Sequence, residues 1–403
     1  MADIKRCSSF LWLFLCVALT PTLASFGAVR VTEFMAANDS GLADEDGEFS
    51  DWIEIHNPDS APISLGGYHL TDNAANLNKW TFPPVMLDPG AYLVVFASGK
   101  NRTDPARRLH TDFQLSAAGG YLGLVAPDGV TVVSAFAPGY PAQFENVSFG
   151  LGGPAPASVW SFFSTPTPGT ANPTGTRAGP IFDDAVRNPA PPAAGPLTIT
   201  ATLRAANDPV ATVRLYYRRM FGAETLVAMT DDGTGGDAQA GDGVWTAIIP
   251  GAAFAPGEMT RWRFIAADST GTETKEPAYR DPLDSHQYFG TVTQDPGVQS
   301  VLPVFHWFTS NPTGANTITG SRGAVYYDGE FYDNVLFSLH GQSSTAFPKK
   351  SYNIDFNRTQ RFRWSTNAPR VADIDLVEPG GHVLGAVPAQ VGRRRANRSG
   401  RAG

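Results

Sequence analysis

Short apolar segments with a period of two, separated by turn-forming residues, are the feature that most constrains the fold of this chain. Residues 29–34 and 51–57 alternate between apolar and polar side chains, and residues 91–96 form a continuous apolar run. The first pattern is typical of a half-buried strand and the second of a fully buried one. Asn57-Pro58 and Asp88-Pro89-Gly90 mark turns between these segments. Strands this short and this closely spaced predict a β-sandwich over residues 28–137.

The remainder of the chain repeats this pattern after an interruption. With 403 residues there is room for two or three domains, and 41 glycines and 32 prolines favour β modules joined by turns over a helical bundle. Alternation resumes in residues 197–203, 213–217 and 262–267, which predicts a second sandwich over residues 197–290. Residues 149–196 are rich in Pro, Gly, Ala and Thr, so we expect a linker with extended, polyproline-like backbone.

The N-terminal residues 1–24 have the organisation of a secretory signal peptide. Lys5 and Arg6 precede an apolar run from Phe10 to Leu19, and small residues follow up to Ala24. A membrane anchor is the alternative, but the run is shorter than the roughly 20 residues that span a bilayer. We therefore expect a protein that is secreted or held at the cell surface, with no stable membrane span after cleavage of this segment.

Both cysteines of the chain, Cys7 and Cys16, lie within the signal segment. The mature protein would then contain no thiol, so neither a disulfide nor a thiolate metal site is expected in it. Its stability outside the cytoplasm would have to come from packing alone.

The charge of the chain argues against nucleic-acid binding. The formal net charge is −8, and the body without residues 1–24 and 377–403 carries 23 basic and 36 acidic residues, a net charge of −13. Proteins that bind nucleic acid need a basic footprint to neutralise phosphates. We therefore expect no nucleic-acid partner.

Four short motifs in the first sandwich occur in a specific order. They are Asp51-Trp52-Ile53-Glu54-Ile55-His56-Asn57, Leu65-Gly66-Gly67-Tyr68-His69-Leu70-Thr71-Asp72, Trp80-Thr81-Phe82-Pro83 and Leu87-Asp88-Pro89-Gly90. This order resembles the lamin-tail domain, an immunoglobulin-like sandwich found in many secreted bacterial proteins. The second predicted sandwich resembles the generic Ig-like modules of such proteins, a resemblance that implies no particular ligand.

A turn of small residues leads into a strand with two lysines further along the chain. The sequence reads His340-Gly341-Gln342-Ser343-Ser344 and, after two residues, Phe347-Pro348-Lys349-Lys350-Ser351-Tyr352. Apolar and polar residues alternate from Tyr352 to Phe356, which places Lys350 on the apolar face of the strand and Lys349 on the polar face. Such a turn next to cations can hold phosphate. Alternatively, both lysines are solvated charges that protect an edge strand from aggregation.

The segment resembles the CotH family of secreted kinase-like proteins, over residues 301–376, although His340 stands where that family usually has arginine. The resemblance implies a site for ATP with Mg²⁺. The residues that it places at the nucleotide are Gly341, Ser343, Ser344, Lys349 and Lys350. The expected fold class is therefore mainly β, with two Ig-like β-sandwiches in tandem followed by an incomplete α+β kinase-like lobe.

Residues 377–403 differ in composition from everything before them, with no aromatic residue, no lysine and the run Arg393-Arg394-Arg395. The CotH resemblance implies a helical, catalytic second half after Leu376. An Arg/Gly/Ala tail takes its place, which we interpret as disordered or as the product of a frameshifted or truncated gene. Asp373 and Asp375 precede this point and no Asp-x-x-x-x-Asn pattern follows, so we assign no catalytic residue.

An acidic, glycine-rich loop at residues 231–243 is the candidate metal site. Its carboxylates belong to Asp231, Asp232, Asp237 and Asp242, and such hard oxygen ligands suit Ca²⁺. The spacing does not fit an EF-hand, because Asp242 stands at position 12. Alternatively, the Asp-Gly steps build a long hairpin loop without metal. The cluster from Asp44 to Glu48 has the same two interpretations, a solvated loop or a weak cation site.

These features predict a secreted or cell-surface multidomain protein that binds or organises partners and is not catalytic as it stands. The expected partner is a cell-surface or extracellular protein or polysaccharide, recognised by loops on rigid sandwiches. The alternative is a fragment of an extracellular CotH-like protein kinase that binds ATP and phosphorylates secreted proteins. Neither a Gly-x-Ser-x-Gly elbow nor a Walker loop occurs in the sequence.

Overall fold

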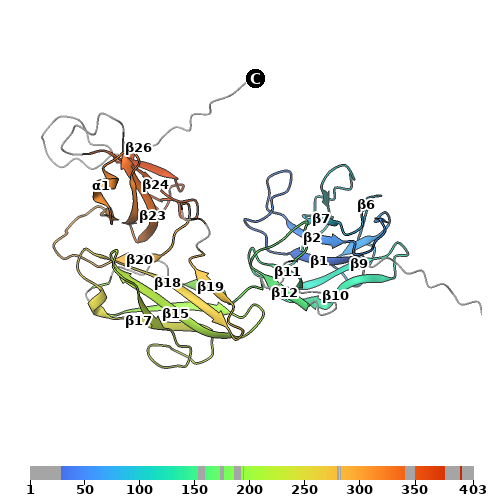
Figure 1. Cartoon of the computed structure of the whole chain (residues 1–403), viewed down its shortest axis with the longest axis horizontal. Coiled ribbons are helices and arrows are strands. Elements are labelled where there is room, and N and C mark those ends of the chain that lie inside the picture. The colour runs from blue at the N-terminus through green and yellow to red at the C-terminus, as the bar shows by residue number, and fades with distance from the viewer. Residues whose placement is uncertain are drawn as a thin grey trace, which may run out of the picture. The chain divides into compact units, whose positions relative to one another are not determined.

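The protein is nearly all β and divides into two compact units (Figure 1). The computed structural model describes residues 29–152, 159–172, 177–185, 192–193, 195–278, 281, 283–340, 350–376 and the backbone of 391–392. The first unit comprises the described residues up to Glu145 together with Thr167–Ala171, and the second unit comprises the others. The prediction of a mainly β fold is confirmed. Residues 1–28, which include the predicted signal peptide, and most of the tail lie outside the described residues.

The first unit is a two-sheet sandwich. One sheet contains β1 (Arg30–Met35), β2 (Asp51–His56), β7 (Tyr92–Ala97) and β8 (Leu109–His110) as successive neighbours. The other has the order β10 (Val132–Tyr140), β9 (Gly120–Val125), β4 (His69–Thr71) and β5 (Trp80–Thr81). A short ribbon pairs β3 (Ile63–Ser64) with β6 (Met86–Leu87). Phe34 of β1 contacts Phe136 and Tyr140 of β10, with ring centroids 5.1 and 4.8 Å apart, and this contact lies between the sheets.

Strand β2 is buried on both faces, although its alternating sequence predicts one solvent face. Ile53 and Ile55 point one way, while Trp52 and Glu54 point the other, and all four are fully buried. Trp52 packs with Met35, Phe96 and the side chain of Leu42, which comes from the loop between β1 and β2. The loop thus covers the face that a two-layer sandwich would leave exposed.

Within the second unit, part of the expected linker is folded. The hairpin of β11 (Ser148–Gly152) and β12 (Val159–Phe163) is held by Phe149, whose ring stacks on Trp160 at 5.8 Å and contacts the tilted ring of Phe162 at 4.7 Å. Strand β13 (Ile181–Ala185) pairs with the following sandwich. The prediction of a linker with extended, polyproline-like backbone over residues 149–196 is therefore wrong for these strands, because a few aromatic residues suffice to order short strands among many Pro and Gly.

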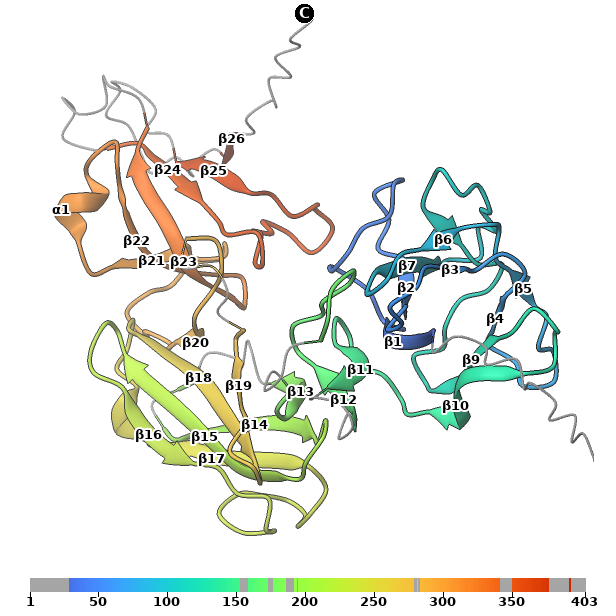
Figure 2. The ribbon, with the colours of Figure 1, turned by 45° about the vertical axis from the view of Figure 1, so that its right-hand side comes forward.

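The second sandwich belongs to the second unit. One sheet has the order β13, β14 (Leu197–Arg204) and β17 (Val244–Ile249). The other has the order β16 (Thr225–Ala228), β15 (Val210–Arg219), β18 (Met259–Asp268) and β19 (Glu273–Glu276), with β20 (Phe289–Val292) also paired to β18. Its core is a cluster centred on Trp262, Phe264 and Leu215, and a 3-10 turn, η1 (Gly251–Ala253), follows β17. Figure 2 shows the strands β14 to β18 of this sandwich at the lower left, below the C-terminal strands.

The third part of the chain is an antiparallel sheet. Its strands follow one another in the order β21 (His306–Thr309), β22 (Ser321–Tyr327), β23 (Glu330–Leu339), β24 (Tyr352–Asp355), β25 (Asp373–Leu376) and β26 (Val391–Gly392). The described residues of this part contain one helix, the single turn α1 (Pro312–Ala315). The sequence predicts an incomplete α+β kinase-like lobe here, but the described residues form an almost purely β module. Ile354 and Phe356 lie in its core, as their alternation predicts.

A buried interface, which we call the seam, joins the second sandwich to this C-terminal sheet. Arg261 of β18 and Asp333 of β23 form an ion pair at 3.1 Å, and their side chains are 5% and 3% exposed. The guanidinium also donates to the carbonyl oxygen of Met220, while the second carboxylate oxygen accepts the backbone N–H groups of Gln287 and Tyr288. An apolar cluster of Met259, Val292, Ala324, Tyr326 and Phe331 lies in the same interface. The two modules therefore share a core.

We expect the substitution Asp333→Asn to destabilise the second unit strongly. It leaves the Arg261 guanidinium buried without a counter-charge, and breaking one partner of a buried pair costs about 3–5 kcal/mol. The free energy of unfolding, measured by urea denaturation, should fall accordingly. The matched control is Glu258→Gln, which breaks an exposed pair with Arg219 and should change little. Equal effects of the two substitutions would show that the seam does not hold the modules together.

Candidate functional site

Most residues of the predicted nucleotide site lie outside the described part of the structure. These are Gly341, Ser343, Ser344 and Lys349. Lys350 is described and half-buried, just before β24. Upstream, His340 contacts Asn353 of β24 and lies 3.2 Å from the carboxylate of Asp375 on β25. In the described residues of this module, no three acidic or histidine side chains come close enough to share a metal ion. The ATP and Mg²⁺ prediction stays a prediction.

The acidic loop at residues 231–243 brings three of its four aspartates together. Oxygen atoms of Asp231, Asp237 and Asp242 lie within 4.8 Å of one another, whereas Asp232 is not part of this group. Asp231 Oδ1 accepts the N–H groups of Gly241 and Asp242 at 2.8 and 3.2 Å, and its Oδ2 accepts that of Gly243 at 3.1 Å.

Asp237 and Asp232 hold the other half of this loop. Asp237 Oδ2 accepts the N–H of Gly233 at 2.6 Å, and Asp232 Oδ1 accepts that of Thr234 at 2.9 Å. Glycines with positive φ, such as Gly236 at 102°, make the turns that these bonds require. Backbone hydrogen bonds alone thus account for the gathering of the carboxylates. Calcium binding here stays a prediction.

The acidic cluster from Asp44 to Glu48 already holds a lysine side chain between its carboxylates. The Nζ atom of Lys100 lies 2.5 Å from Asp44, 2.7 Å from Asp46 and 2.9 Å from Glu48. This ammonium group occupies the position between the three carboxylates that a metal ion would need. Burial alone would raise the pKa of Asp44, but hydrogen bonds from Lys100 and from backbone amides outweigh it and hold that pKa well below its usual range.

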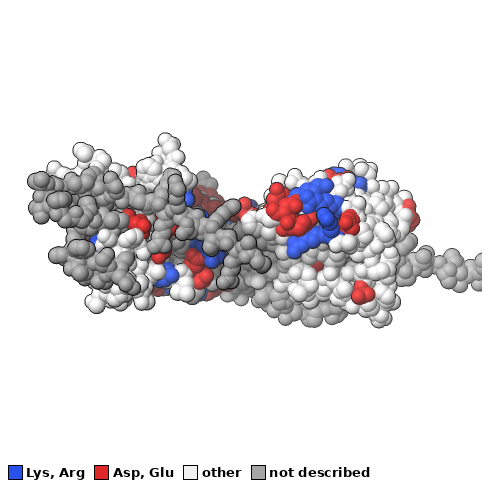
Figure 3. All heavy atoms as spheres, turned by 90° about the horizontal axis from the view of Figure 1, so that it is seen from above, with Lys and Arg blue, Asp and Glu red and all other residues white. Residues whose placement is uncertain are grey.

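Basic side chains extend this cluster into a network on the first unit. Arg102 donates to Glu45 at 2.6 Å and to Asp46 at 2.7 Å, and the buried ring of His110 lies 3.0 Å from Glu45. Desolvation would raise the pKa of Glu45, but the hydrogen bonds from His110 and Arg102 lower it to about 2. Figure 3 shows acidic and basic side chains side by side on this unit. Because Lys100 and Arg102 already lie among these carboxylates, the cluster fits the interpretation as a structural loop better than that as a cation site.

Two buried glutamates of the first unit are residues that sequence reasoning missed. Glu33 and Glu54 are both fully buried. Glu54 accepts the hydroxyl of Thr32 at 2.6 Å and the N–H of Gly169 at 2.8 Å, and Glu33 accepts the N–H of Thr167 at 3.2 Å. They therefore fix the segment Thr167–Ala171 on the first unit. In the sequence, both occupy ordinary polar positions of alternating strands, so no local signal marks them.

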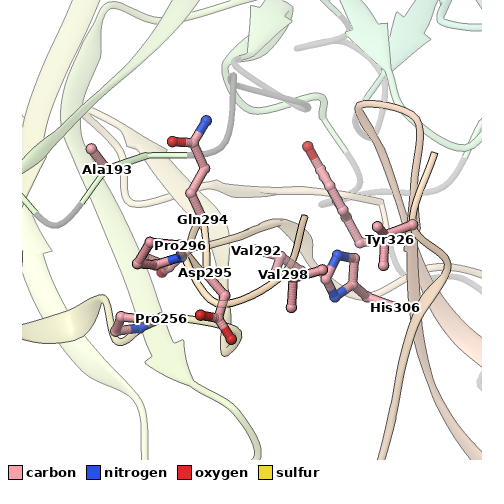
Figure 4. A pocket seen from close by; sticks show the side chains of 11 residues that line it. Ala193, Pro256, Val292, Gln294, Asp295, Pro296, Val298, His306 and Tyr326 are labelled. Carbon is pink, nitrogen blue, oxygen red and sulfur yellow. The ribbon is translucent and has the colours of Figure 1, made fainter. Parts of the chain in front are cut away.

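The second unit contains a cavity of about 570 Å³ next to the seam. Its lining includes Val292, Asp295, Val298, His306 and Tyr326, and Figure 4 shows Val298 and His306 close to each other with the Tyr326 ring beside them. Desolvation lowers the pKa of His306, against the opposing effect of Asp295, and so favours the neutral form of the ring.

The chemistry of this cavity fits binding better than catalysis. Thr293, another lining residue, is buried, and its hydroxyl has no hydrogen-bond partner among the described residues. Among the described residues, the lining contains no lysine, arginine, cysteine or serine. It therefore offers neither a cation for a phosphate nor a serine or cysteine nucleophile for His306 to activate. The cavity has the size of sites for small ligands.

A comparison with known families identifies the first unit. Residues 22–137 match the family model of the lamin tail domain, and the sandwich of the first unit covers this range from residue 29 onward. The resemblance to the lamin tail domain that the four sequence motifs carry is thus confirmed, and the first unit contains this Ig-like domain. No curated protein matches the chain significantly. Among the described residues, no helix has both the length and the apolar character needed to cross a bilayer.

We expect the stability of the first unit to fall as the pH rises from about 4.5 to about 7. Desolvation and the charge of Glu33 raise the pKa of Glu54 to about 7, against the hydrogen bonds from Thr32 and Gly169. A carboxyl whose folded pKa is raised stabilises the fold fully below its unfolded pKa, and this contribution is lost as the pH rises through the folded pKa. The loss amounts to about 3 kcal/mol, from roughly 1.4 kcal/mol per pKa unit.

Thermal unfolding between pH 4.5 and 8 measures this effect, and Glu54→Gln should remove most of it. A smaller dependence should remain from Asp51, whose pKa desolvation raises to about 6. The control Asp88→Asn changes an exposed carboxylate in a turn and should keep the full pH dependence. A wild-type melting temperature that is constant over this range would contradict the assignment.

Proposed function

We propose that this chain is an exported, non-catalytic binding and scaffold protein that presents two packed β bodies to an extracellular partner. The observation that carries the proposal is the seam. Its buried ion pair and shared apolar cluster join the second sandwich and the C-terminal sheet into one body, which can display loops in fixed positions. The lamin tail domain supports the same class of function. Export is supported by the composition of residues 1–24.

The partner that fits this proposal is a cell-surface or extracellular protein or polysaccharide. The charged network of the first unit contains more carboxylates than cations, so it offers no basic footprint to nucleic acid. Sandwich modules bind through loops and strand faces that their cores hold in place. The binding chemistry therefore lies on the surface of these modules rather than in a catalytic centre.

We expect the mature chain to retain a component of an extracellular fraction. Immobilised protein from residue 25 onward is incubated with cell-wall polysaccharide and with secreted protein, and the retained material is quantified. A second column carries the unfolded chain as the control. If the folded chain retains more of one component than this control does, the proposal is supported. Equal retention on both columns would contradict it, because scaffold function requires the folded surface.

The kinase alternative predicts a different result. Phosphoryl transfer needs acidic residues that hold Mg²⁺ and orient the nucleophile, and the described residues of the C-terminal sheet gather no such set. We therefore expect no incorporation of labelled phosphate from ATP into the chain itself or into a test protein. Incorporation that is lost in Lys350→Ala but kept in Lys275→Ala, an exposed lysine on β19, would overturn the non-catalytic assignment.

A further inference from the structure

One face of the second sandwich carries a ladder of arginines, which we call the arginine face. Arg214, Tyr216 and Arg218 alternate along β15 and therefore point to the same side of the sheet. Across the strand pair, Arg263 of β18 lies opposite Tyr216, and Arg261 lies opposite Arg218. Four guanidinium groups thus lie on one face of two neighbouring strands, in a protein whose net charge is strongly negative.

Three of these four arginines have acidic partners. Arg214 pairs with Glu273, Arg263 with Glu224 at 2.7 Å, and Arg261 with Asp333 at 3.1 Å. In each pair the guanidinium donates to one carboxylate. Their charges cancel, so they offer little to an external anion.

Arg218 is the exception on this face. It forms no ion pair and no hydrogen bond with any described residue, and its Nε atom is buried without an acceptor. The side chain as a whole is half-buried. A guanidinium has five donor N–H groups. Leaving a guanidinium unpaired beside a second arginine costs free energy unless water or a ligand accepts its hydrogen bonds. The arginine face therefore carries one guanidinium more than it has carboxylate partners: Arg218 is near Glu224, but that carboxylate already pairs with Arg263.

The structure holds this guanidinium in a defined position. The Arg218 guanidinium carbon lies over the Tyr288 ring, 4.5 Å from its centroid. The ring is fixed at both ends, because the backbone N–H of Tyr288 donates to Asp333 and its hydroxyl donates to Glu224 at 2.7 Å. A guanidinium stacked on an aromatic ring keeps its N–H edges free for a planar acceptor. Little side-chain entropy is lost when such a group binds a carboxylate.

We propose that Arg218 binds the carboxylate of an acidic polysaccharide, with a uronic acid unit as the group recognised. A guanidinium and a carboxylate form two parallel hydrogen bonds. Next to Arg218, Tyr216 lies two residues along the strand, roughly 7 Å away, and opposite Tyr216 is Leu226, which is 53% exposed. The ring of a sugar can lie on the Leu226 side chain while the carboxylate of the same sugar reaches Arg218.

Other polyanions fit this face less well. Nucleic acid and anionic membranes are bound by several unpaired cations that act together, whereas here one charge is free and its arginine neighbours are paired. A single guanidinium beside an apolar surface suits a ligand that brings one carboxylate to each contact with the protein. This inference names the partner class of the proposed scaffold function and rests on that function.

The test uses the full mature chain and oligogalacturonate as the probe, with binding measured by calorimetry at low salt. The expected result is binding that weakens at least tenfold in Arg218→Ala and less in Arg218→Lys, which keeps the charge but loses the paired hydrogen bonds. The matched control is Arg219→Ala, since Arg219 is the next residue of β15 and pairs with Glu258. Its affinity should stay within about twofold of the wild type. Melting temperatures of all variants confirm that they fold.

Three outcomes would overturn the inference. The first is no binding of oligogalacturonate by the wild type, and the second is equal binding by the wild type and by a folded Arg218→Ala variant. The third is equally tight binding of poly-glutamate, because the apolar surface would then contribute nothing. If Arg218→Ala still retains the extracellular component of the wild type, the scaffold function stands and only the arginine site fails.

Discussion

The buried ion pair between Arg261 and Asp333 is the interaction on which the second unit depends. The two residues are 72 positions apart in the sequence and come from different modules. Removing two charges from water costs several kcal/mol per ion unless each finds further partners. Here both do, since Asp333 accepts two backbone N–H groups and Arg261 donates to the carbonyl of Met220. Close packing adds a second constraint, because a Cβ atom at Gly290 would lie 2.7 Å from the Phe331 ring.

Carboxylate side chains stabilise the folded structure at several places in this acidic chain. Asp44 binds Lys100, Asp231 accepts three backbone N–H groups of its own loop, and Glu54 joins a distant segment to the first unit. In each case the partner is a cation or a backbone amide of the same chain. Clusters of acidic residues in the sequence therefore suggest metal sites, while the structure explains the same clusters through internal donors. At Asp44 the internal donor is a lysine that lies among three carboxylates, and that lysine is 56 residues away in the sequence.

The sequence predicts what depends on local pattern and misses what depends on distant contacts. Strands such as β2, β7 and β24 follow from alternation or from a continuous apolar run, and the motif around Trp52 identifies the lamin tail domain. The strands β11 to β13 escape prediction because Pro and Gly dominate the composition around them. The burial of Glu54 and the seam could not be predicted, because each depends on a partner more than 70 residues away.

The seam and the arginine face are physically connected through Tyr288. Asp333 accepts the backbone N–H of this tyrosine, Glu224 accepts its hydroxyl, and the ring in turn carries the guanidinium of Arg218. Arg261 lies 5.0 Å from the centroid of the same ring, yet its charge is balanced by Asp333, so the excess positive charge falls on Arg218 alone. The contact that joins the two modules thus also positions the one unpaired guanidinium of this face. A surface site built in this way needs no cavity, because the residues packed beneath the Arg218 guanidinium already hold that group in a fixed orientation.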